Sequence, residues 1–173
     1  MSARITRIEI MPLPRWARVA LAARCLKRAR ALVNPTAEQA TILDKAIAGI
    51  DGSASSGKWS EGLAETAAAA YSLALDRLDA PSTTDEAHDR DVVTCMVAHA
   101  AAFAAEAASQ PDAHRAAHLV AQSVDFVVHA FRLSGTGDTS EAMAAMRADL
   151  EKLWAAEPTW NDQTPVSQDF FEG

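Results

Sequence analysis

The sequence predicts an all-α fold, a single-domain bundle of about six Ala-rich helices. Of the 173 residues, 39 are alanine, only 6% are aromatic, and Gly and Pro number 7 each. Alanine is the strongest helix former, whereas the β-branched and aromatic residues that favour strands are too sparse for a large sheet. Apolar residues also recur at spacings of three and four, which is the pattern of one helix face.

The N-terminal part is predicted to form a short extended arm followed by a helix. The arm covers the first dozen residues and ends at the segment Met11 to Pro14, because its two prolines stop regular structure. A helix is then expected from Arg15 to Val33, with arginines on one face. Its opposite, buried face comprises Val19, Ala22, Leu26, Ala29 and Val33.

The next two helices are delimited by caps and breakers. Thr36 and Gln39 have capping-box spacing, and Ile42, Ala46 and Ile50 mark the buried face of the helix that they begin. Residues 51–57 are Ser- and Gly-rich and are predicted to form a flexible loop. Ser60 is the expected N-cap of the third helix, which ends before Pro81.

Three further helices complete the predicted bundle domain, residues 1–158. Thr83 or Thr84 caps a helix to about Ser109, and Pro111 opens one to Leu133, so that these two form a central hairpin. The second of them is expected to be the most buried helix. Asp138 and Glu141 begin the last helix, which Pro158 ends, and its core face comprises Met143, Met146, Leu150 and Leu153. Residues 159–173 are predicted to be an irregular tail that wraps on the bundle.

Charge is distributed unevenly along the chain. The formal net charge of −7 argues against nucleic-acid binding, because phosphate contacts need a basic surface. Half of the 16 basic residues nevertheless precede residue 31, where only Glu9 opposes them. The basic first helix is therefore expected to dock on, or lie beside, an acidic bundle, and contact with an anionic partner is the alternative.

Two isolated cysteines and the absence of an export signal predict a cytoplasmic protein. Cys25 and Cys95 lie in apolar helical segments, where a free cysteine behaves as a small buried hydrophobe. The longest uncharged run, Val92 to Ala105, is shorter than the ~17–25 apolar residues that span a bilayer. We therefore expect no membrane association.

The most specific polar pattern lies on the predicted fifth helix. His114, His118, Asp125 and His129 share one helix face, and imidazoles one turn apart can bind a single metal ion. The alternative is the solvated face of an amphipathic helix. The fourth helix carries further polar residues that could meet this face, namely His88, Asp91, Cys95, His99 and Glu106. Because His99 lies on the apolar stripe of that helix, a hydrogen-bonded core histidine is expected there.

No other catalytic signature is found. HExxH, a phosphate-binding glycine loop and the GxSxG elbow are all missing from the sequence, and no cofactor is predicted. The neighbouring acids Asp89 and Asp91, and likewise Asp149 and Glu151, do not share a helix face and are expected on the solvated surface. An enzyme is therefore not favoured.

Three segments resemble the small all-helical immunity proteins of bacterial polymorphic toxin systems. They are Arg18–Leu32 (RVALAARCLKRARAL), Ile47–Asp51 (IAGID) and Val92–Ala102 (VVTCMVAHAAA). The resemblance implies a non-enzymatic protein that binds a protein partner such as a toxin, and an acidic surface suits a basic toxin. We therefore expect an immunity-like or regulatory interaction module. The alternative is a metal-dependent helical-bundle enzyme that uses the His and Asp face of the fifth helix.

Overall fold

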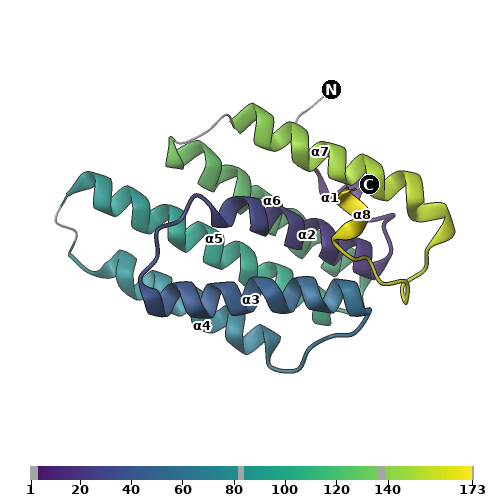
Figure 1. Cartoon of the computed structure of the whole chain (residues 1–173), viewed down its shortest axis with the longest axis horizontal. Coiled ribbons are helices and arrows are strands. Elements are labelled where there is room, and N and C mark those ends of the chain that lie inside the picture. The colour runs from purple at the N-terminus through teal and green to yellow at the C-terminus, as the bar shows by residue number, and fades with distance from the viewer. Residues whose placement is uncertain (1–3, 82–83, 136–138, 173) are drawn as a thin grey trace.

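The computed structural model describes residues 4–81, 84–135 and 139–172, and every regular element in these ranges is a helix (Figure 1). The predicted all-α class is confirmed, and the six longer helices follow the predicted order. The elements are α1 (Arg7–Ile10), α2 (Arg15–Arg30), α3 (Ala37–Ser56), α4 (Leu63–Asp79), α5 (Asp85–Ser109), α6 (Ala113–Ser134), α7 (Thr139–Ala156), the 3-10 helix η1 (Glu157–Thr159) and α8 (Asp169–Glu172).

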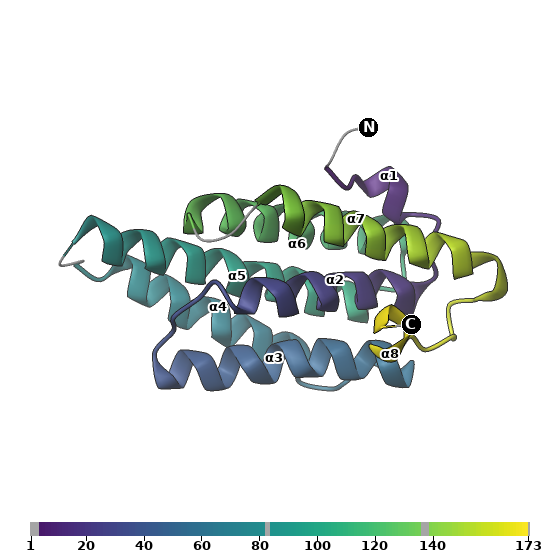
Figure 2. The ribbon, with the colours of Figure 1, turned by 45° about the horizontal axis from the view of Figure 1, so that its top comes forward.

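The long helices pack in two layers of three. One layer has α5 between α4 and α6, and the other has α2 between α3 and α7. In Figure 1 the layer of α2 lies in front of the layer of α5, and Figure 2 shows the two layers turned. Among all pairs of elements, α5 and α6 make the most extensive contact, as the predicted central hairpin requires.

The most buried helix is α2, which corrects the expectation that α6 would be. It packs against α3, α5, α6 and α7, and most of its residues are buried. Fully buried alanines on several of its sides, such as Ala17, Ala20 and Ala23, permit this because small side chains let neighbouring helices approach closely. One of its arginines, Arg18, is only 4% exposed.

Two helix starts agree with their predicted caps, Thr36 and Thr84. The Thr36 hydroxyl accepts a hydrogen bond from the Gln39 amide at 3.3 Å, and the Gln39 side chain accepts one from the Thr36 amide. The Thr84 hydroxyl accepts a hydrogen bond from the Ala87 amide at the start of α5. At the start of α6, where Pro111 was predicted to open the helix, the Asp112 carboxylate accepts one from the Arg115 amide. Each cap satisfies an amide that has no partner within its helix. The capping position predicted for Asp138 lies outside the described residues.

The predicted loop at residues 51–57 is helical as far as Ser56, which corrects the composition-based prediction. Ser53 and Ala54 are buried, and the Ala54 carbonyl accepts a hydrogen bond from the Val166 amide of the C-terminal tail at 2.9 Å. This tertiary contact overrides the weak helix propensity of the segment. The helix ends at Gly57, whose φ of 67° is a left-handed conformation that suits glycine. The following helix is preceded by Gly62 as N-cap, not Ser60.

The predicted extended N-terminal arm contains the short helix α1, which is a third correction. Thr6 and Glu9 form a capping box at its start. Its C-terminal residue Ile10 is fully buried, and the Trp154 indole donates a hydrogen bond to the Glu9 carbonyl at 2.9 Å. The arm is therefore helical because α7 holds its single turn in place.

The C-terminal tail packs on the bundle near the ends of α2 and α3. Phe171 and Val166 are buried, and the Trp160 and Phe170 rings meet edge to face with centroids 4.9 Å apart. The Asp162 carboxylate accepts a hydrogen bond from the Arg15 amide at 2.8 Å, which fixes the tail at the start of α2.

Candidate functional site

The four predicted metal ligands lie on the outward side of α6, but the structure does not gather them. His114, His118 and His129 are exposed. The Asp125 carboxylate instead pairs with the Arg4 guanidinium, with an Nη2 to Oδ2 distance of 2.6 Å. Within the described ranges, no group of three or more His, Cys, Asp or Glu residues is placed to hold a metal ion.

The arrangement of this histidine face leads to a direct test. We expect purified protein to carry no stoichiometric first-row metal, and His118→Ala to change the free energy of unfolding by ~0.5 kcal/mol or less, as on most surfaces. Elemental analysis of the parent and variant proteins, followed by urea unfolding, measures both quantities. Bound metal that is lost in the variant would establish the metal-dependent alternative.

Neither cysteine is suited to nucleophilic chemistry. Both thiols are buried, as predicted. Burial raises the pKa of the Cys25 thiol to about 12, and it also raises the pKa of Cys95. Because the thiolate is the reactive form, these thiols are held in their unreactive state.

The basic residues of α2 are used within the fold. The Arg15 and Arg18 guanidinium groups donate to the Ala108 and Ala113 carbonyls, at 2.5 and 2.8 Å, and so hold the turn between α5 and α6. Arg24 and Arg28 both face Asp149 of α7, while the remaining pairs are Lys27 with Asp51 and Arg30 with Asp44. Asp149 is buried, which corrects its predicted place on the solvated surface. These contacts support the interpretation of α2 as a basic helix docked on acidic neighbours.

A different surface, on the side of α5 that faces away from the core, is left half-exposed by the described residues. Val92, Met96, His99 and Phe103, here called the outer stripe, repeat at spacings of four, three and four and are all half-buried. They lie opposite the fully buried Val97, Ala101 and Ala104 on the helix. Tyr71 of α4 and Phe126 of α6 flank the outer stripe. These six residues are called the outer face below.

An aromatic stack centres the outer face on His99. The imidazole ring stacks on Tyr71 and Phe103, with centroid distances of 4.2 and 4.5 Å, and contacts Phe126 at 4.4 Å. Burial lowers the pKa of His99, so the neutral ring is favoured. His99 was predicted to be a hydrogen-bonded core histidine. In the structure it is half-buried and stacked on aromatic rings.

The apolar composition of α5 is typical of a helix that other elements enclose on all sides. By length and composition, Asp85–Ser109 is the one helix in the described ranges that could cross a membrane, although 56% of its apolar window is buried in the bundle. The uncharged run from Val92 to Ala105 is by itself too short to indicate a membrane-spanning helix. A helix that is apolar all round is normally enclosed by other elements. Here α2, α3, α4 and α6 contact α5, and the outer stripe is left half-exposed.

The acidic residues that account for the net charge of the chain lie in the segment that contains α4 and α5. Residues 59–110 hold nine acidic and two basic residues, which accounts for the whole formal charge of −7, and the rest of the chain is balanced. Asp91 pairs with Arg77 and Glu106 with Arg115. The other acids of this hairpin make no ion pair with a described residue, and they are Glu61, Glu65, Asp76, Asp79, Asp85, Glu86 and Asp89.

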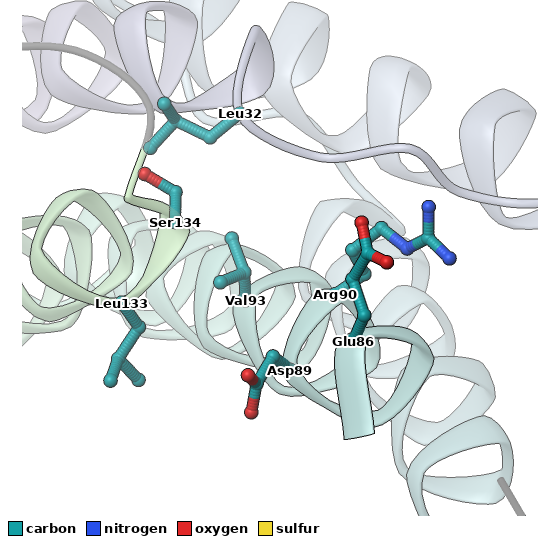
Figure 3. Close-up of a pocket in the computed structure, with 7 residues that line it drawn as sticks. All are labelled: Leu32, Glu86, Asp89, Arg90, Val93, Leu133 and Ser134. Atoms are coloured by element: carbon teal, nitrogen blue, oxygen red, sulfur yellow. The ribbon is translucent and has the colours of Figure 1, made fainter. Parts of the chain in front are cut away.

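A pocket of about 260 Å³ lies where the first turns of α5 meet the end of α6 and Leu32, just after α2 (Figure 3). Its apolar part is formed by Leu32, Val93 and Leu133, and Leu133 is 51% exposed. Glu86, Asp89 and Arg90 from the first turns of α5 add three charges, and Ser134 completes the lining. The pocket therefore combines apolar walls with two carboxylates that pair with no cation among the described residues.

Sequence reasoning identified His99 but not the outer face. The predicted polar set on this helix was chosen by residue type, whereas the exposed feature is apolar and aromatic. The signal in the sequence is the alternating spacing of Asp85, Asp89, Val92, Met96, His99, Phe103 and Glu106, a second stripe on a helix whose opposite side is already apolar.

The described residues form an all-α bundle with a half-exposed aromatic face on α5. Comparison with known proteins adds no relative, since no family model, curated protein or solved structure matches the chain significantly. Function is therefore argued from the surface alone.

Proposed function

We propose that this chain is a non-enzymatic interaction module that binds a protein partner through the outer face. The observation that carries the proposal is the outer stripe, because apolar and aromatic side chains are left half-exposed on the one described helix that is long and apolar enough to cross a membrane. Contiguous apolar patches rimmed by polar residues mark interaction sites. Aromatic residues and Met are also enriched at the centres of protein interfaces.

The rest of the site chemistry supports binding more than catalysis. The two cysteines are held as thiols, and Asp125 of the histidine face is engaged by Arg4. The outer face contains one imidazole, that of His99, which packs against three aromatic rings and makes no ion pair with a described carboxylate. General acid or base catalysis needs a second positioned group within hydrogen-bond reach of the reacting atoms.

At a finer level, we propose an immunity-like or regulatory role in the cytoplasm of a bacterium. The segments that resemble immunity proteins include Val92–Ala102, which carries most of the outer stripe. If the neighbouring gene encodes a toxin, co-production of this chain is expected to restore growth of cells that make the toxin. Failure to protect against that toxin would contradict the immunity role but not the interaction module.

Site-specific photo-cross-linking tests the interaction module. A photoreactive phenylalanine analogue placed at Phe103 is expected to yield an adduct with a second polypeptide in cells of the source organism. The same analogue at Ala155, an exposed position on α7, is the matched control and should give none. Adducts at both positions, or at neither Phe103 nor Met96, would contradict the proposal.

A further inference from the structure

We propose that the partner presents a basic amphipathic helix, which lies along the outer stripe between α4 and α6 and places a Lys or Arg side chain in the pocket of Figure 3. This inference rests on the proposed interaction function and specifies the chemistry of the partner.

The spacing of the outer stripe favours a helical partner. Residues that alternate at spacings of three and four form the seam along which two helices pack. From Val92 to Phe103 the stripe extends for about 17 Å, which corresponds to about three turns of a partner helix. Tyr71 and Phe126 stand on the two neighbouring helices, so they border this seam on both sides.

The acidic residues of α4 and α5 favour a basic partner. The unpaired acids of α4, Glu65, Asp76 and Asp79, recur at spacings of eleven and three and therefore share one stripe of that helix. Asp85 and Asp89 continue the outer stripe itself toward the start of α5. A cationic helix would gain attraction from both sets, and the attraction would speed its association.

The same charge argues against a second copy of this chain on the outer face. A symmetric dimer places the same patch on both subunits. Here it would bring together two hairpins that each carry the formal charge of residues 59–110, with most of their acids unpaired. Like charges juxtaposed across an interface are strongly unfavourable.

The pocket provides an anchor for one cationic side chain. Val93 and Leu133 can cover the methylene stem of a Lys or Arg, while Glu86 and Asp89 add negative charge to the same lining for its charged end. Arg90 also lines this pocket, and its positive charge opposes the binding of a cation there. Removing the charge of Arg90 should therefore strengthen binding, whereas removing that of Asp89 should weaken it.

A synthetic peptide serves as the probe. It has 21 residues, with leucine at alternating spacings of three and four and lysine elsewhere, and its binding to the full chain is followed by fluorescence anisotropy. One comparison peptide replaces each lysine by glutamate, and another scrambles the basic sequence. We expect the basic amphipathic peptide to bind at least about tenfold more tightly than either, with an affinity that falls as salt rises.

Matched variants locate the binding surface. Asp76→Asn with Asp79→Asn should weaken binding about threefold or more, and Asp89→Asn by a similar factor, while Arg90→Gln should tighten it. Glu38→Gln with Glu151→Gln removes two exposed carboxylates elsewhere and should change affinity less than twofold. Because all these side chains are exposed, the variants should remain folded, and circular dichroism checks this.

The outcomes separate this inference from the proposed function. Equal binding of the basic and acidic peptides, or an unchanged affinity in the acid variants, overturns the basic helix. A photo-cross-linked partner at Phe103 would still uphold the interaction module in that case. Sedimentation that shows a dimer broken by Phe103→Ser would overturn the basic partner in favour of a second copy.

Discussion

Replacing Asp149 by alanine is expected to lower the free energy of unfolding by about 3 kcal/mol. The Asp149 carboxylate pairs with the Arg28 guanidinium and lies 3.8 Å from Nε of Arg24. Its side chain is only 7% exposed. Removing it would leave two partly buried cations without their counter-charge, which costs far more than a lost surface pair. Urea unfolding followed by circular dichroism measures the change.

The matched control for Asp149→Ala is Asp44→Ala. Asp44 also pairs with an arginine of α2, since its Oδ1 lies 2.5 Å from Nε of Arg30, but its side chain is 55% exposed. Exposed pairs contribute about 0–1 kcal/mol, because water screens both charges before and after folding. An Asp149→Ala effect no larger than that of Asp44→Ala would show that α7 does not depend on this ion pair.

The position of Asp149 illustrates which information a local pattern lacks. In the sequence, Asp149 and Glu151 look like two acids on a solvated helix, and Glu151 is indeed exposed. Asp149 is buried because α7 packs against α2, where Arg24 and Arg28 lie more than 100 residues earlier in the chain. The pairing becomes visible only when the packing of the helices is known.

Local signals were sufficient for the long helices and for the caps at Thr36 and Thr84. Thr36, Thr84 and Asp112 lie just before their helices and satisfy amides three residues ahead, so the contact is contained within four residues. The segments where prediction failed depend on distant contacts. The end of α3 is held by Val166, and α1 is held by Trp154.

The outer face was missed for a similar reason. The stripe of Met96, His99 and Phe103 has the spacing of a core face, and the sequence contains no indication of which of the two apolar sides of α5 is covered. That depends on α2 and α3 packing on one side only. Aromatic neighbours from α4 and α6 then enclose His99 only in part.

Leu26→Ala is expected to destabilise the fold by about 3 kcal/mol, because it creates a cavity in the most buried helix. Leu26 is fully buried on α2, which contacts α3, α5, α6 and α7, so few neighbours can move to fill the space. The same substitution at Leu133, which is 51% exposed at the rim of the pocket, should cost only ~0.5 kcal/mol. Urea unfolding of both variants compares the same Leu-to-Ala change at a buried and at an exposed position. Similar losses of stability for the two leucines would contradict the central position of α2, whereas a weakened peptide affinity in Leu133→Ala alone would agree with its place beside the outer face.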